Sequence, residues 1–226
     1  MTRAAVRTTA FIFDMDGTMV ESMPAHAKSW EMFKERHHLE LSVEEILQRT
    51  TGRNGIECVR ILLGVDIPDD QAKALIDRKE ADYREIFARE FREVAGFAKF
   101  VRQAQERGLK IAVATAGDKN NLGFVLKRLD LQRDPDAEVR GDQGLPGKPE
   151  PDIFLQAARQ LGAAPAACIV FEDAPFGIEA AKRAGMRAVA ICSTHGADEL
   201  AGPHVIASVR DYEELMNNNF LESLHA

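Results

Sequence analysis

The sequence lacks the features that mark disulfide-rich, membrane and nucleic-acid-binding proteins. It has only three cysteines among 226 residues, which predicts buried, reduced thiols and a cytoplasmic location. No apolar run reaches the length of a membrane-spanning helix, so we expect no membrane partner. A net charge of −7 argues against general nucleic-acid binding. The short apolar stretch before Asp14 predicts a first strand and not a signal peptide.

The stretch 11–22, with the sequence FIFDMDGTMVES, concentrates reactive side chains at the end of an expected strand. Its three apolar residues predict a buried strand, and Gly17 marks a sharp turn after it. Asp14 and Asp16 alternate along an extended backbone, so their side chains leave in opposite directions. Ligands of open α/β sheets bind just beyond the carboxyl ends of strands. We therefore expect Asp14 to stand at a binding site.

Alternating strand and helix patterns predict an α/β fold for most of the chain. Further strands are expected at 110–115, within 134–147, and at 167–171, 187–191 and 205–208. Helical patterns lie between them at 97–107, 122–129, 151–161 and 178–184. This alternation predicts a doubly wound parallel sheet with right-handed crossovers.

One long segment interrupts this alternation, because residues 21–95 show helical patterns and no convincing strand. The clearest patterns lie at 56–63 and 68–91, and Ser42 followed by Glu45 predicts a helix start. We predict an α/β catalytic core formed by residues 1–20 and 96–226. An inserted, all-helical domain formed by residues 21–95 would lie between its two parts.

Polar residues end three of the expected strands and should meet at one edge of the sheet, because parallel strands align their carboxyl ends. They are Asp14, Asp16, Thr115, Glu172 and Asp173. Lys148 reaches the same edge from a loop. Taken singly, Asp173 could be a helix cap, Thr115 a turn residue and Lys148 a solvated lysine. Their conjunction on successive strand ends favours a shared active site.

The chemistry of this group of side chains favours phosphoryl transfer assisted by a cation. Clustered carboxylates repel one another unless a cation joins them. Mg²⁺ is commonly held by one or two carboxylates together with a phosphate and water. The ion and Lys148 would neutralise the phosphoryl oxygens, and Thr115 and the backbone N–H groups beside Gly17 and Ala116 would donate hydrogen bonds.

Two neighbouring carboxylates suit a two-step displacement. Asp14 could attack phosphorus and form an aspartyl-phosphate. Asp16 could protonate the leaving oxygen and then activate the water that hydrolyses this intermediate.

These residues resemble the motifs of the haloacid dehalogenase superfamily of phosphohydrolases. Asp14-Met15-Asp16-Gly17-Thr18 resembles its first motif, Thr115 its second, Lys148 its third and Glu172-Asp173 its fourth. The resemblance implies that Asp14 is the nucleophile and Asp16 the general acid/base. It also implies Mg²⁺ held by Asp14, the backbone carbonyl of Asp16 and Asp173, with Glu172 beside it directly or through water.

The helical insert is similar to the cap of the β-phosphoglucomutase-like branch, which implies a cap that closes over the site and helps to choose the substrate. The resemblance implies substrate contacts from His26, Trp30 and Lys79 on the cap. Arg53 lies in a cap loop flanked by glycines, where its long cationic side chain could reach an anionic substrate. On the core, substrate contacts are expected from Gly17, Thr18 and Ala116. Core packing remains the alternative for His26 and Trp30, and a solvated charge for Arg53 and Lys79.

Three departures favour a phosphatase over a mutase. Arg53 precedes the position of the mutase arginine, where Gly55 stands instead. The pair Lys119-Asn120 comes one position late, and Thr18 is the commoner phosphatase choice. Asp16 argues against dehalogenation, whose leaving group needs no proton.

We therefore predict a monomeric, Mg²⁺-dependent phosphatase whose partner is a small phosphorylated metabolite, with a sugar phosphate favoured. Pyrophosphate, phosphoglycolate and nucleotides remain open as substrates. The alternatives are a β-phosphoglucomutase-type isomerase and a catalytically idle binding protein on the same scaffold.

Overall fold

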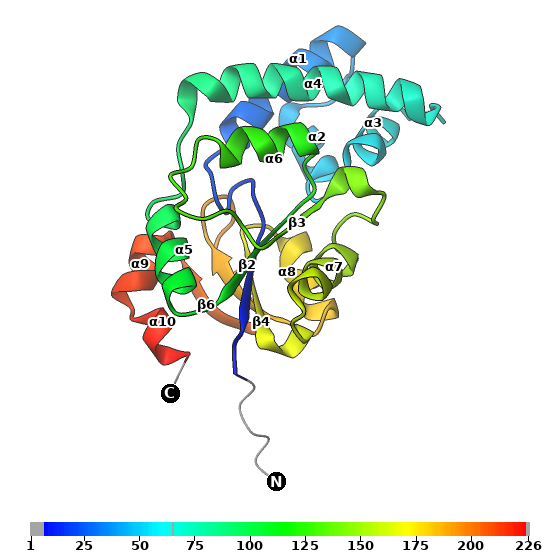
Figure 1. The fold of residues 1–226 in the computed structure, drawn as a ribbon. Coiled ribbons are helices and arrows are strands. Elements are labelled where there is room, and N and C mark those ends of the chain that lie inside the picture. The colour runs from blue at the N-terminus through cyan, green and yellow to red at the C-terminus, as the bar shows by residue number, and fades with distance from the viewer. Residues whose placement is uncertain (1–6, 65, 225–226) are drawn as a thin grey trace.

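The computed structural model describes residues 7–64 and 66–224. The ends of the expected core, residues 1–6 and 225–226, therefore lie outside the described residues. Six parallel strands form one sheet in the order β3-β2-β1-β4-β5-β6 (Figure 1). Their bounds are Ala10–Phe13 for β1, Lys110–Thr115 for β2, Ala137–Arg140 for β3, Cys168–Glu172 for β4, Arg187–Ile191 for β5 and Val205–Val209 for β6.

Helices cover both faces of the sheet, which confirms the doubly wound α/β fold. Alternate residues of β1 point to opposite faces. Phe11 and Phe13 join the cluster beneath α5 (Phe97–Glu106) and α9 (Tyr212–Asn217). Ala10 and Ile12 join the cluster beneath α7 (Asp152–Leu161) and α8 (Pro175–Arg183). β1 is thus buried on both faces and lies in the middle of the sheet.

The remaining helices of the core are α6 (Lys119–Leu126) and α10 (Phe220–Ser223), with short 3₁₀ turns at Gly141–Gln143 and Pro165–Ala167. The sequence patterns had not predicted α9 or α10. They also placed the start of α6 three residues late, because they missed its cap. The carboxylate of Asp118 accepts a hydrogen bond from the backbone N–H of Asn121 (2.7 Å) and so begins the helix earlier.

The segment between β1 and α5 is helical, as the sequence predicted, and its described residues form four helices. They are α1 (Met23–His37), α2 (Val43–Thr50), α3 (Gly55–Leu63) and α4 (Asp69–Glu90). They share an apolar cluster of their own, formed around Trp30, Phe33, Ile46, Val59 and Ile76. In Figure 1 they form a layer across the carboxyl ends of the strands. We call these helices the helical insert, and its status as a separate domain stays a prediction.

The chain enters and leaves the helical insert through two adjacent segments. Val20 and Glu93 form an isolated antiparallel bridge. The N–H of Glu21 donates to the carbonyl of Arg92, and the N–H of Val94 to that of Met19, both at 3.0 Å. None of the helices in residues 7–64 and 66–224 is both long and apolar enough to cross a membrane.

Candidate active site

The predicted polar residues meet at one edge of the sheet. Phe13 of β1 pairs with Val113 of β2 and with Phe171 of β4, so the carboxyl ends of these three strands lie side by side. This register brings together five residues whose side chains are all buried: Asp14, Thr115, Lys148, Glu172 and Asp173. Lys148 comes from the loop before α7.

Lys148 forms a bridge between two of these carboxylates. Its Nζ donates hydrogen bonds to Asp14 Oδ1 and to Glu172 Oε1. Burial alone would lower the pKa of Lys148, but the two carboxylates raise it above its usual value. For Asp14, burial raises the pKa well above its usual value although Lys148 opposes this. One ammonium group is therefore shared by two buried carboxylates and only partly compensates them.

Both carboxylate oxygens of Glu172 are engaged. Oε1 accepts from Lys148, and Oε2 accepts from the backbone N–H groups of Asp173 and Ala174, both at 3.0 Å. This arrangement fixes Lys148 beside Asp14. The place of Glu172 beside Mg²⁺, directly or through water, stays a prediction.

Asp173 is held by hydroxyl groups in a tightly packed position. Its Oδ1 accepts from Thr18 Oγ1 at 3.1 Å, and its Oδ2 accepts from Thr194 Oγ1. A Cβ atom at Gly17 would lie 2.2 Å from Oδ2, so only glycine leaves room for this carboxylate. Burial and the neighbouring Glu172 raise the pKa of Asp173 to about 7.

Gly17 and Thr18 were expected to contact substrate, but neither is among the residues that line the cavity described below. The hydroxyl of Thr18 is fully buried and serves Asp173. The N–H of Gly17 donates to the carbonyl of Val20 at 2.8 Å, so it is not available to a phosphate in this structure.

Asp16 lies in a different environment and receives hydrogen bonds on one oxygen. Its Oδ1 is contacted by Ser22 Oγ (2.6 Å), His26 Nε2 (3.1 Å) and Tyr83 Oη (3.4 Å). Burial would raise the pKa of Asp16, but His26 and the hydroxyl of Ser22 more than offset this and lower it. The pKa values of Asp14 and Asp16 are thus shifted in opposite directions, although both residues follow the same strand.

His26 is positioned from two sides. Its ring stacks on Tyr83 with 3.9 Å between ring centroids, and its Nδ1 lies 2.8 Å from Lys79 Nζ. An ammonium group only donates hydrogen bonds, so Nδ1 is the acceptor and Nε2 carries the proton that is donated to Asp16. Lys79 is 1% exposed, and its Nζ lies 4.5 Å from the ring centroid of the buried Trp30.

A cavity of about 610 Å³ lies between the strand ends and the helical insert. Eleven of the predicted site residues line it: Asp14, Asp16, His26, Trp30, Arg53, Lys79, Thr115, Ala116, Lys148, Glu172 and Asp173. Arg53 reaches it from the loop between α2 and α3. The backbone N–H of Lys148 donates to the carbonyl of Gly52 in this loop at 3.0 Å, so the loop contacts Lys148 directly.

The donor set suits a hard cation. The pKa values of Asp14 and Asp173 are both raised, first by burial and then by neighbouring carboxylates, and a cation would relieve that repulsion. Within the described residues, no three Asp, Glu, His or Cys side chains are arranged to hold a metal ion. Mg²⁺ does not require three, because it commonly keeps waters and binds one or two carboxylates.

Comparison with known proteins places most of the chain in one family. Residues 8–185 match the family model described as haloacid dehalogenase-like hydrolase. The phosphorylated carbohydrates phosphatase of Thermotoga maritima is 29% identical over 92% of this chain and 96% of its own length. The β-phosphoglucomutase of Bacillus subtilis is 31% identical over 80% of this chain and 82% of its own.

A solved structure of a hydrolase from Pseudomonas syringae superposes with a TM-score of 0.83 at 28% identity. The match covers 95% of this chain and 99% of the other. The family resemblance seen in the motifs is thereby confirmed. The chain belongs to the haloacid dehalogenase-like hydrolases.

Proposed function

We propose that the protein is an Mg²⁺-dependent phosphatase that hydrolyses a small phosphomonoester, with a sugar phosphate favoured, through a phosphorylated Asp14. The observation that carries this proposal is the contrast between Asp14 and Asp16. Asp14 lies beside the buried Lys148, whereas Asp16 receives its hydrogen bonds on a single carboxylate oxygen. The name of the Thermotoga relative, a phosphatase of phosphorylated carbohydrates, supports the substrate class.

In the first step, a carboxylate oxygen of Asp14 attacks phosphorus, and the bond from phosphorus to the sugar oxygen breaks. The leaving oxygen takes a proton from Asp16. The hydrogen bonds on Oδ1 leave Oδ2 as the oxygen that carries this proton. Because the pKa of Asp16 is lowered here, it must be protonated from water when the anionic phosphoryl group arrives and raises that pKa.

In the second step, Asp16 acts as the base. It takes a proton from a water molecule, whose oxygen attacks phosphorus, and the bond to Asp14 breaks to release phosphate. Asp14, Asp173 and the backbone carbonyl of Asp16 would hold Mg²⁺, which supplies charge neutralisation for the phosphoryl oxygens. Thr115 and Lys148 would orient these oxygens, and Thr18 and Gly17 would keep Asp173 in place.

The second candidate is a β-phosphoglucomutase-type isomerase, because one relative carries that name. It requires a cation for the second phosphate of a bisphosphate intermediate. Arg53 lines the cavity and could take this role. Arg53 stands next to Gly52, and Gly55 occupies the position of the mutase arginine, a departure that favours simple hydrolysis.

The test is phosphate release from sugar phosphates, phosphoglycolate, nucleotides and pyrophosphate, with Mg²⁺ and after chelation with EDTA. We expect Mg²⁺-dependent release from one class, and none from the Asp14→Asn variant. Activity retained by Asp14→Asn would remove the assignment of the nucleophile. Interconversion of hexose 1-phosphate and 6-phosphate, primed by a bisphosphate, would favour the mutase, and no turnover in either assay would favour an idle binding protein.

A further inference from the structure

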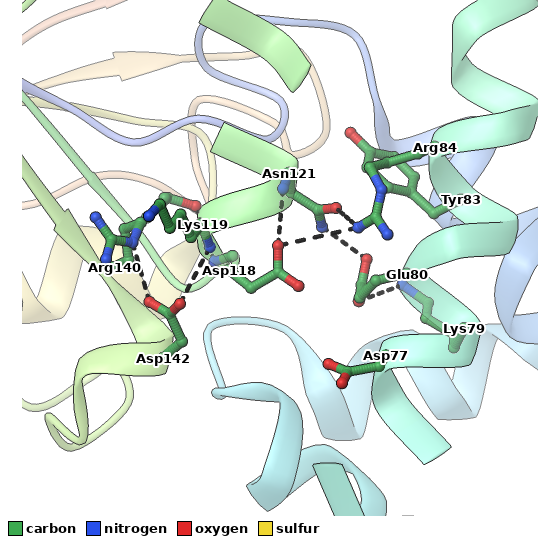
Figure 2. A network of polar contacts seen from close by, with 12 residues as sticks. Asp77, Lys79, Glu80, Tyr83, Arg84, Asp118, Lys119, Asn121, Arg140 and Asp142 are labelled. Atoms are coloured by element: carbon green, nitrogen blue, oxygen red, sulfur yellow. Dashed lines mark hydrogen bonds and ion pairs between the residues drawn. The ribbon is translucent and has the colours of Figure 1, made fainter. Parts of the chain in front are cut away.

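A polar contact outside the catalytic chemistry joins the helical insert to the core. Asn121 of α6 is 1% exposed, and its amide contacts two residues of α4 (Figure 2). Its Nδ2 donates to Glu80 Oε2 and its Oδ1 accepts from Arg84 Nη1, both at 2.7 Å. The two bonds fix which way the amide faces, because a flipped amide would place donor against donor and acceptor against acceptor.

The contact continues inward, residue by residue, to Asp16. The other oxygen of Glu80, Oε1, accepts from Lys79 Nζ at 3.0 Å. The same ammonium group donates to His26 Nδ1 at 2.8 Å, and His26 Nε2 lies 3.1 Å from Asp16 Oδ1. Glu80 and His26 each use one polar atom toward Asn121 and another toward Asp16, and the single ammonium nitrogen of Lys79 joins the two residues.

The two central residues of this series, Glu80 and Lys79, are largely buried. The side chain of Glu80 is 14% exposed and that of Lys79 1% exposed, so neither can exchange a lost partner freely for water. If Asn121 lost its amide, Glu80 would keep one unsatisfied oxygen in a largely buried position. The carboxylate would then turn toward other donors, and Lys79 would lose the partner that holds it against His26.

We propose that Asn121, held by Arg84, is a positioning residue that fixes the Asp16 carboxylate through Glu80, Lys79 and His26. The proposal rests on the proposed function, because it assigns Asn121 to the step in which Asp16 protonates the leaving oxygen. It also implies that Asp16 is correctly oriented only while α4 is docked on α6. General acid catalysis would then depend on whether the helical insert is docked on the core.

The test compares two substrates that differ in their need for a proton. The leaving group of a sugar phosphate is a sugar alkoxide, which requires a proton from the general acid. The leaving group of p-nitrophenyl phosphate is p-nitrophenolate, a stabilised anion that does not require one. The value of kcat/KM reports the steps through the first bond cleavage, so it isolates this difference. The variants are Asn121→Ala and Asn121→Asp, which keeps the size and the bond to Arg84 but places a carboxylate against Glu80.

The matched control is Arg89→Ala, which removes an exposed ion pair with Glu85 on the same helix, away from the cavity. We expect both Asn121 variants to lose about 10- to 100-fold in kcat/KM on the sugar phosphate. On p-nitrophenyl phosphate the loss should stay below about threefold, as a sign that the nucleophile is intact. Arg89→Ala should behave like the unmodified protein on both substrates.

Equal losses on both substrates, or no loss on either, would overturn the proposal. A second measurement covers the case in which Asn121→Ala fails to fold. Glu80→Ala and the double variant Glu80→Ala/Asn121→Asp should show the same selective loss, because both substitutions interrupt one series. If the double variant instead lost the sum of the two single effects on the free-energy scale, Asn121 would act independently of Glu80, and the proposal would be wrong. If the proposed function itself is wrong, the unmodified protein will release phosphate from neither substrate.

Discussion

The substitution Gly177→Ala tests how strictly the position of Glu172 is fixed. Gly177 lies in the first turns of α8 and is buried. A Cβ atom there would lie 1.9 Å from Cδ and Oε1 of Glu172, far inside any real contact. The methyl group and the carboxylate cannot occupy this space together. Glu172 would have to move, and its bond to Lys148 would break.

Gly123 provides the matched control, because it is also helical and a Cβ atom there would meet nothing within 4 Å. Helix propensity alone would make both substitutions stabilising by about 0.5–1 kcal/mol. The difference between them therefore isolates overpacking, which costs about 1–3 kcal/mol. For a chain of this length, this corresponds to roughly 2–4 °C in Tm for each kcal/mol.

The assay combines thermal unfolding with phosphate release. We expect Gly123→Ala to equal or exceed the unmodified protein in both measurements. Gly177→Ala should unfold at a lower temperature and lose about 100-fold in kcat/KM, because Lys148 shifts relative to Asp14. If Gly177→Ala were as stable and active as Gly123→Ala, the packing of Glu172 against Gly177 would not be what positions Lys148.

Three further predictions concern other parts of the molecule. Thr18→Val should raise the Mg²⁺ concentration needed for half-maximal activity by roughly tenfold, because Asp173 loses a donor that orients it. Burial would raise the pKa of Glu80, but the charge of Lys79 and the hydrogen bond from Asn121 lower it below its usual value of 4.5. The stability that Glu80 adds over Glu80→Gln should therefore be present above pH 4.5 in denaturant titrations and shrink as the pH falls below it. Thiol labelling followed by mass spectrometry should find Cys192 modified first, because burial raises the pKa of Cys58 to about 12 and that of Cys168 to about 11.

The sequence predicted the parts of the site that depend on strand ends. Asp14 and Asp173 each follow a recognisable apolar strand and Thr115 ends another, and parallel strands bring such positions to one edge. The spacing of apolar residues likewise separated the helical insert from the core. These predictions needed only local patterns and the topology that those patterns imply.

The partners of Asp16 could not be predicted in this way. Tyr83 and the Glu80–Asn121 contact depend on how α4 docks on the core, which local periodicity does not encode. Thr194 follows β5, but nothing in its neighbourhood marks it as a partner of Asp173. The helices α9 and α10 have only six and four residues, too short for a periodic apolar face to be recognised.

The central place of β1 also governs how the site comes into being. Ala10 pairs with Lys110 on one side and with Cys168 on the other, so the two neighbours of β1 are both remote in the chain. Pairings of such high contact order form slowly, because a long loop must close before they become favourable. Asp14 and Asp16 are neighbours along the chain, yet Lys148 and Asp173 reach them only when these long-range pairings are complete. Recovery of activity during refolding is therefore a measure of the finished topology, whereas helix content can recover before it.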